Sequence, residues 1–170
     1  MDKLWSPWRS KYIESFSMEK KEEGCIFCNQ QLIDINSKEN LIVYKGKNTF
    51  VILNLYPYNS GHLMVIPYRH TNDFLSLNAE ESLEIMQNLQ LSIKALQTAM
   101  HPNGFNVGAN VGKSAGAGID QHLHFHIVPR WTGDINFMPV IGEVKVLSQD
   151  LLETKEKLIS AFEKLKTENI

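Results

Sequence analysis

Residues 121–129 read QHLHFHIVP and place His122, His124 and His126 at every second position. In a β-strand successive side chains point to opposite faces, so the three imidazoles would share one face at a spacing of roughly 6.5 to 7 Å. The apolar residues between them would then enter the core. The stretch therefore predicts a half-buried strand with a row of histidines on its outer face.

Three explanations fit such a row. Alternate strand histidines can bind a catalytic metal, because neutral imidazole is a common metal ligand. Alternatively, the middle histidine attacks a phosphorus atom while its neighbours bind or protonate phosphate oxygens. An ordinary amphipathic strand would explain the period of two, but not why each polar position is a histidine. We favour covalent catalysis, with the metal site as the open alternative.

Two other segments favour a phosphate ligand. The loop NVGKSAGAG, residues 110–118, ends in four small residues, which let backbone N–H groups approach an anion, although such residues also form ordinary hairpin loops. The segment NLYPYNSGH runs from Asn54 to His62 and would place an amide and an imidazole on the rim of a turn. Capping of that turn is the alternative role of Asn54.

The composition is that of a folded protein without a strong overall charge. The 170 residues are 43% hydrophobic and 21% charged, and we find no repeat or linker that would divide them. We predict one domain over residues 1–170 with amino- and carboxy-terminal extensions. The formal net charge of -2 gives no general attraction to nucleic acid or an anionic membrane, so a small phosphorylated ligand is the better partner.

The expected cellular compartment decides which chemistry the two cysteines favour. No apolar run approaches the ~20 residues of a spanning helix, and the amino terminus lacks the apolar region of a secretory signal. We therefore expect a cytoplasmic protein. Its cysteines are Cys25 and Cys28, in the sequence CIFC. In a reducing cytosol this pair indicates metal ligation or redox chemistry before a structural disulfide.

The remaining pattern predicts an α+β fold with an antiparallel sheet of about five strands, one long helix and a carboxy-terminal helix. We expect strands at residues 41–44, 49–53, 62–67, 105–111 and 122–129, and helices at residues 79–100 and 148–165. Asn78 and Glu81 have the spacing of a capping box at the start of the long helix. Its apolar row would consist of Leu83, Met86, Leu89, Ile93, Leu96 and Met100.

The segment QHLHFHIVPRW resembles the His-x-His-x-His signature of the histidine triad family. The segments LNLYPYNSGHLMVIPYRH and GFNVGANVGKSAGAGIDQ resemble the same family in the same order, and the resemblance covers roughly residues 25–140. The segments LWSPWRSKYI and RWTGDINFMPV are most similar to its branch of diadenosine polyphosphate hydrolases and phosphorylases.

This resemblance implies cleavage at the α-phosphorus of a nucleotide through a covalent nucleotidyl-histidine. His124 would be the nucleophile, with a backbone carbonyl of its own strand holding the other ring nitrogen, and His122 and His126 would complete the catalytic set. Arg130 is an alternative to Lys113 as the cation that meets a polyphosphate. The substrate-binding positions implied are Asn54, His62, Asn110, Lys113, Ser114, Gly116 and Gly118.

The resemblance also implies a cofactor and an assembly. Cys25, Cys28, His70 and His122 would hold a structural Zn²⁺ in a closed tetrahedron, with two reduced thiols in a metal-free branch as the alternative. Mg²⁺ would enter only with the substrate. The protein would be a homodimer with sheets joined edge to edge. Leu91 and Ala95 lie outside the apolar row of the long helix and would add apolar surface for that contact.

The sequence is also compatible with other functions. A nucleoside phosphoramidase would use the same covalent step with an amine leaving group. A nucleotide-binding module without turnover would keep the same loop and rim. Water and orthophosphate use the same nucleophile, so the sequence does not distinguish a hydrolase from a phosphorylase.

Overall fold

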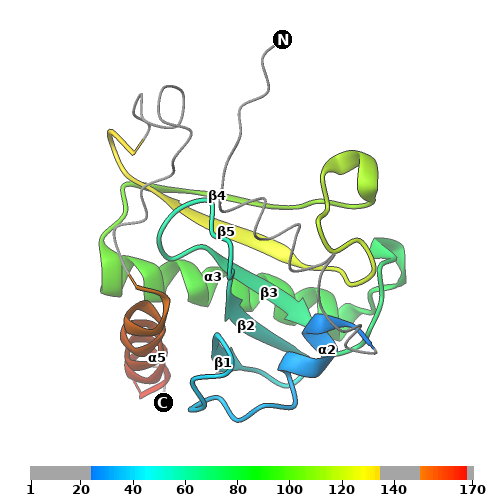
Figure 1. The fold of residues 1–170 in the computed structure, drawn as a ribbon, viewed down its shortest axis with the longest axis horizontal. Coiled ribbons are helices and arrows are strands. Elements are labelled where there is room, and N and C mark those ends of the chain that lie inside the picture. Colours follow the sequence, from blue (N-terminus) through cyan, green and yellow to red (C-terminus); the bar gives the residue numbers. More distant parts are fainter. Residues whose placement is uncertain (1–23, 135–149, 168–170) are drawn as a thin grey trace.

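The computed structural model describes residues 24–134 and 150–167, and within them one antiparallel sheet carries the architecture (Figure 1). The strand order is β1-β2-β3-β5-β4, and all neighbours are antiparallel. The predicted α+β class is confirmed. The strands are β1 Ile42–Lys45, β2 Thr49–Leu53, β3 Leu63–Pro67, β4 Gly104–Ala109 and β5 Phe125–Arg130, and the helices are α2 Ile26–Gln30, α3 Ala79–Met100 and α5 Leu151–Thr167, with short 3-10 turns η1 Phe74–Ser76 and η2 Lys113–Ala115.

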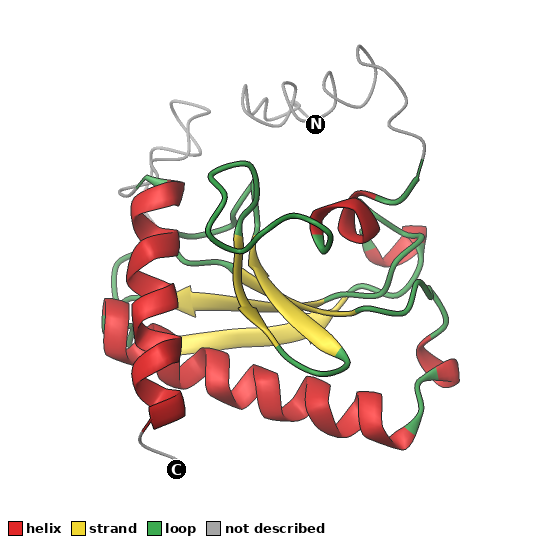
Figure 2. Cartoon of the chain, turned by 90° about the horizontal axis from the view of Figure 1, so that it is seen from below, coloured by secondary structure: helices red, strands yellow, loops and turns green. Residues whose placement is uncertain are grey.

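Apolar side chains cover both faces of the central strands. On one face the sheet packs against α3 and α5, and Figure 2 shows α3 running along the sheet with α5 at one side. On the other face a second cluster contains Phe27 from α2 together with Phe50 and Ile66. All five residues of β2 and of β3 are therefore buried. This two-sided burial explains why both strands read as continuous apolar runs.

The histidine strand begins later than predicted. We expected a strand over residues 122–129, but β5 begins at Phe125, so His122 and His124 precede it. The neighbouring strand β3 ends at Pro67, which has no N–H to continue the ladder. Instead, the N–H of Leu123 donates to the Thr71 carbonyl at 2.7 Å. The expected row of three histidines on one strand is thus wrong, because only His126 belongs to the strand.

The long helix has the predicted bounds but a different buried face. The capping box of Asn78 and Glu81 is confirmed. Leu83 and Met86, which we placed in the apolar row, are 60% and 55% exposed, whereas Ala95, which we placed outside it, is fully buried. The prediction failed because polar residues also occupy the buried face, among them Asn88, which donates to Thr49 Oγ1 at 2.6 Å. The buried positions are Glu81, Ile85, Asn88, Leu89, Ser92, Ala95 and Leu96.

Two lysines donate hydrogen bonds to backbone carbonyls of the segment that connects α2 to β1, and they hold this segment in place. Lys155 of α5 is 4% exposed, and its ammonium donates to the carbonyls of Ser37 at 2.7 Å and Asn40 at 3.0 Å. Lys45 donates to the carbonyls of Gln31 and Ile33. Burial lowers the pKa of Lys155, and the carbonyls compensate for the water that the ammonium has lost.

None of the helices among the described residues has the length and apolar character that crossing a membrane requires.

Strand β4 lies at one edge of the sheet, and its residues Asn106, Val107 and Gly108 are exposed. Within residues 24–134 and 150–167 no further strand pairs with this edge, and a free edge can pair with a second copy. The homodimer nevertheless stays a prediction, which sizing across a dilution series would test.

Glu84 joins α3 to the turn between β1 and β2. Its carboxylate accepts from the backbone N–H of Asn48 at 2.9 Å, from the backbone N–H of Thr49 at 3.1 Å and from the Asn48 side chain at 2.8 Å. Any side chain at Gly46 would collide with this carboxylate. This carboxylate therefore contributes several of the hydrogen bonds that hold the helix to the hairpin.

We expect Glu84→Ala to lower the free energy of unfolding by about 1 to 3 kcal/mol, because it leaves two partly buried N–H groups without an acceptor. The matched control is Glu80→Ala in the same helix. Glu80 pairs with Lys47 at 3.3 Å, but their side chains are 73% and 80% exposed, so its loss should cost about 0.5 kcal/mol or less. Urea unfolding measures both variants, and equal losses would contradict the assignment.

Candidate active site and metal site

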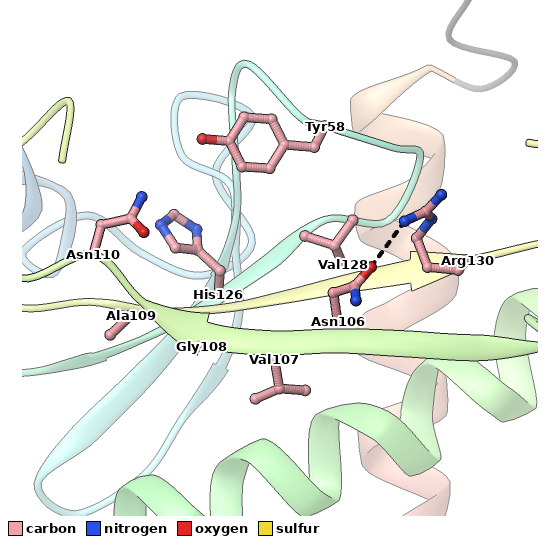
Figure 3. A pocket seen from close by; sticks show the side chains of 9 residues that line it. All are labelled: Tyr58, Asn106, Val107, Gly108, Ala109, Asn110, His126, Val128 and Arg130. Carbon is pink, nitrogen blue, oxygen red and sulfur yellow. Dashed lines mark hydrogen bonds between the residues drawn. The ribbon is translucent and has the colours of Figure 1, made fainter. Parts of the chain in front are cut away.

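A groove of about 350 Å³ runs over β4 and β5 on the side of the sheet away from α3. Figure 3 shows His126, Asn106 and Arg130 on this side of the two strands, with Tyr58 above them. Asn110 lines the same groove just beyond the end of β4. The alternation of side chains along a strand produces this lining, since His126, Val128 and Arg130 all share a face of β5.

The hydrogen bonds of His124 fix which of its nitrogens carries the proton. Its Nδ1 lies 2.8 Å from the backbone carbonyl of His122. A carbonyl can only accept, so Nδ1 carries hydrogen and Nε2 of the neutral ring keeps a lone pair. The side chain is 5% exposed, and this burial lowers the pKa of His124, against the effect of the carbonyl. A buried, neutral imidazole with Nε2 unprotonated is the form that can attack an electrophile.

Two consecutive hydrogen bonds hold His126 in the tautomer opposite to that of His124. The backbone N–H of Tyr58 donates to Nδ1 of His62 at 3.1 Å, so the proton of the His62 ring resides on Nε2. That Nε2 lies 3.0 Å from Nδ1 of His126 and must donate to it. His126 therefore carries its own proton on Nε2. Tyr58 also stacks on His62, with ring centroids 4.9 Å apart.

The two neighbouring imidazoles thus have complementary functions. The rings of His124 and His126 are 4.8 Å apart between centroids and nearly perpendicular. Burial, together with the proximity of His124, lowers the pKa of His126 to about 4. At neutral pH one ring offers a lone pair and the other a proton, which is the combination that nucleophilic attack with protonation requires.

Cys25, Cys28, His70 and His122 come together in a second cluster beside the groove residues. Their four ligand atoms all lie within 4.8 Å of one another. Nδ1 of His122 is 3.3 Å from Sγ of Cys25 and 3.6 Å from Sγ of Cys28, and Nδ1 of His70 is 3.4 Å from Sγ of Cys28. Nε2 of His122 donates to the Pro67 carbonyl at 2.9 Å, so its Nδ1 is unprotonated and directed at the sulfurs.

The sulfur–nitrogen distances in this cluster fit tetrahedral coordination of a metal ion. With Zn–S near 2.3 Å and Zn–N near 2.0 Å, the sulfur–nitrogen edges of a tetrahedron are about 3.5 Å, close to the distances observed. The alternative of redox chemistry fits less well, because burial and the neighbouring Cys25 raise the pKa of the Cys28 thiol. Redox-active cysteines instead have a lowered pKa. The predicted ligand set therefore forms a possible metal site.

The remaining predicted positions divide into two groups. Asn54 caps its turn by accepting from the Tyr56 N–H at 3.0 Å, and its amide nitrogen lies 3.4 Å from Nδ1 of His62. Asn110 lines the groove. The four predicted positions further along the loop are exposed and do not line the groove, and the ammonium of Lys113 lies 3.6 Å from the Asp120 carboxylate. This second group contains Lys113, Ser114, Gly116 and Gly118.

Several groups around the site were missed in the sequence. Phe27 lies between the two cysteines in sequence, and its ring is 5.6 Å from that of His122 and 5.3 Å from that of His124. Asp134 accepts from Nε and Nη2 of Arg130, along one edge of the guanidinium, at 2.6 and 2.8 Å. The spacing of four residues between these opposite charges was a usable signal for that pair. No comparable signal marked Phe27, because its contacts are remote in sequence.

Comparisons with known proteins agree with this geometry. A family model described as the HIT domain matches residues 36–133. The AP-4-A phosphorylase of Mycobacterium tuberculosis is 39% identical over 165 residues, which cover 95% of this chain and 85% of that protein. The bis(5'-adenosyl)-triphosphatase of Saccharomyces cerevisiae is 35% identical over 91 residues, 53% of this chain and 44% of that protein. A Zn-bound histidine triad family protein from Mycobacterium smegmatis superposes with a TM-score of 0.68 at 27% identity, covering 85% of this chain and 96% of that one.

We expect His126 to titrate at about pH 4 in the folded protein. Between that pH and about 6.5, the ordinary value for histidine, the unfolded chain binds a proton that the folded chain excludes. The free energy of unfolding should therefore fall as the pH falls through this window. Nitrogen-detected NMR titration measures the ring, and urea unfolding of His126→Asn should show a weaker pH dependence than the parent. A ring that titrates near 6.5 would contradict this.

Proposed function

Because this chain belongs to the HIT domain family of enzymes, we propose that it cleaves dinucleoside polyphosphates, such as diadenosine tetraphosphate, at the α-phosphate. The observation that carries the proposal is the pair of opposite tautomers on His124 and His126. A binding module without turnover would have no need of a nucleophile and a proton donor side by side. The two relatives named for diadenosine polyphosphates support the choice of substrate class.

In this proposal Nε2 of His124 attacks the α-phosphorus, and the bond from that phosphorus to the bridging oxygen breaks. A covalent nucleotidyl-His124 forms, and the leaving polyphosphate takes the bonding electron pair. The Nε2–H of His126 donates to the α-phosphate or to the departing oxygen, with His62 behind it, which places the proton where negative charge develops. His122 contributes through its carbonyl, which keeps the attacking nitrogen of His124 unprotonated.

The groove offers mainly neutral groups to the phosphates. We propose Asn110 as a donor to them, with the exposed loop of Lys113, Ser114, Gly116 and Gly118 closing over the polyphosphate. Arg130 and Lys113 both have carboxylate partners already. Mg²⁺ brought by the substrate would therefore offset the phosphate charge that these side chains do not neutralise.

Orthophosphate is the acceptor that we propose for the second step. Its oxygen attacks the phosphorus of the nucleotidyl-histidine, the bond to Nε2 of His124 breaks, and the ring regains its lone pair. The products from diadenosine tetraphosphate are then ADP and ATP. The relative that covers nearly the whole chain is named a phosphorylase, which supports this choice over water.

We also propose that the cluster of Cys25, Cys28, His70 and His122 holds a structural Zn²⁺. The donor set supports zinc because two thiolates and two imidazoles are the ligands of closed tetrahedral sites. A metal there would fasten α2 to the segment just ahead of β5. Its role would be to position this chain's own residues, since four protein ligands leave no coordination site for substrate.

The replacement His124→Asn should abolish turnover and leave nucleotide binding nearly intact. It removes the nucleophilic nitrogen but keeps a polar side chain of moderate size. Activity should fall by at least about a thousandfold, since the covalent step has no substitute nucleophile. The matched control His101→Ala changes an exposed histidine at the end of α3. Turnover near the parent rate in His124→Asn would rule out the assignment.

Product analysis completes that experiment. With orthophosphate present, diadenosine tetraphosphate should yield ADP and ATP in equal amounts. AMP and ATP would show that water resolves the intermediate instead. Cleavage of an adenosine phosphoramidate with no cleavage of the tetraphosphate would favour the phosphoramidase alternative.

We expect the purified protein to contain about one zinc ion per chain, bound by the four-residue cluster. Elemental analysis of Cys28→Ser should show loss of the metal, whereas His101→Ala should retain it. Chelation should lower the melting temperature clearly while it changes the rate of the chemical step only slightly, because the site is closed to substrate. A preparation made without chelator that contains no metal would contradict the zinc site.

A further inference from the structure

We propose that Asp134 is a positioning residue that sets the tautomer of His126 from outside the site, acting through Asn59 and the turn that carries Tyr58 and His62. The inference rests on the proposed function for its catalytic meaning. Its structural part concerns protons on imidazole rings and can be measured without substrate. The sequence offered no reason to connect Asp134 with the histidines.

The Asp134 carboxylate is the centre of a compact network at the end of β5. It accepts from Nε and Nη2 of Arg130, from the backbone N–H of Trp131 at 3.1 Å and from Nδ2 of Asn59 at 2.8 Å. The side chain is 10% exposed. Hydrogen bonds from Arg130 hold the pKa of this carboxyl well below its usual range, so the acceptor stays ionised throughout the neutral pH range.

Asn59 lies in the turn between β2 and β3, and its side chain connects this turn to the Asp134 network. Its amide nitrogen donates to Asp134 and also to the Pro129 carbonyl at 3.1 Å, so the turn is fixed to the end of β5. Its backbone carbonyl accepts from the N–H of His62 at 3.1 Å. Tyr58, the preceding residue, donates its N–H to the His62 ring. The position of this N–H thus depends on where Asn59 is held.

The position of the Tyr58 N–H determines which ring nitrogen carries the proton in His62 and in His126. While it points at Nδ1 of His62, Nε2 of His62 must donate to His126, and His126 must carry its proton on Nε2. If the turn moves away, His62 can hold its proton on Nδ1 and accept at Nε2. His126 would then donate from Nδ1 and present a lone pair at Nε2, which cannot protonate a substrate oxygen. The contact from the Asn54 amide, at 3.4 Å, is too long to fix the ring alone.

The test compares Asp134→Ala with Asp134→Asn, which keeps an oxygen for the Asn59 amide. Ring-nitrogen NMR of the protein without substrate reports the tautomers of His62 and His126. We expect Asp134→Ala to move His126 toward the Nδ1–H form and Asp134→Asn to retain the parent tautomer. For cleavage of diadenosine tetraphosphate, Asp134→Ala should lower kcat by about a hundredfold, the size of a lost proton donor, with KM changed less than about threefold, and Asp134→Asn should recover most of the rate.

The matched control is Glu81→Ala, which removes another carboxylate bound by an arginine. Glu81 pairs with Arg69 at 2.7 Å and is 7% exposed, but it has no bond to the turn. It should lower the melting temperature without changing either tautomer. Should Asp134→Ala fail to fold, Asn59→Ala provides the same test, because the pair of Arg130 and Asp134 remains.

Two failures can be told apart. An unchanged tautomer of His126 in the folded alanine variant overturns the inference, whatever the activity. A tautomer change in Glu81→Ala as large as that in Asp134→Ala also overturns it, since the effect would then follow general destabilisation. A parent protein that cleaves no dinucleoside polyphosphate would instead reject the proposed function, while the tautomer measurement still decides the structural part.

Discussion

The hydrogen bond from Nδ1 of His124 to the carbonyl of His122 joins the two parts of this site. The same residue, His122, directs its ring at the cysteine sulfurs and its carbonyl at the proposed nucleophile. Phe27 of α2, which lies between the two cysteines in sequence, contacts both rings. The cluster of potential metal ligands and the groove therefore share one backbone segment. A displacement of that segment would change the protonated nitrogen of His124 as well as the geometry of the cluster.

Backbone groups determine, directly or through a second imidazole, the tautomers of the three triad histidines and of His62. The Pro67 carbonyl fixes His122, the His122 carbonyl fixes His124, and the Tyr58 N–H fixes His62, which in turn fixes His126. Backbone groups have no alternative rotamer, so they define a proton position more strictly than a mobile side chain would. Burial adds the second condition, since it lowers the pKa of the three triad histidines and keeps their rings neutral.

The sequence predicted the elements better than their faces. Periodicity and the capping box placed α3 correctly, because these signals are local along the chain. The buried face of α3 was wrong because Glu81 and Asn88 are satisfied by Arg69 and Thr49, which are distant in sequence. The start of β5 was wrong for a similar reason, since it depends on where its neighbour β3 ends at Pro67. The four potential metal ligands were brought together as expected, whereas Asn59 and Asp134 were missed because only the fold places them beside each other.

The groove offers a polyanion hydrogen-bond donors at fixed positions more than it offers free positive charge. The nearest cations are already paired, Arg130 with Asp134 and Lys113 with Asp120. The groups directed to the groove beside His126 are therefore neutral donors such as the Asn110 amide and the imidazole N–H. Neutral donors at fixed positions discriminate by geometry, whereas free cations would attract many anions with little regard to shape. A site built in this way positions one phosphorus atom and does not simply attract phosphate. Such a site requires each donated hydrogen to be in place before the substrate binds. The backbone contacts of the histidines fix those hydrogen positions.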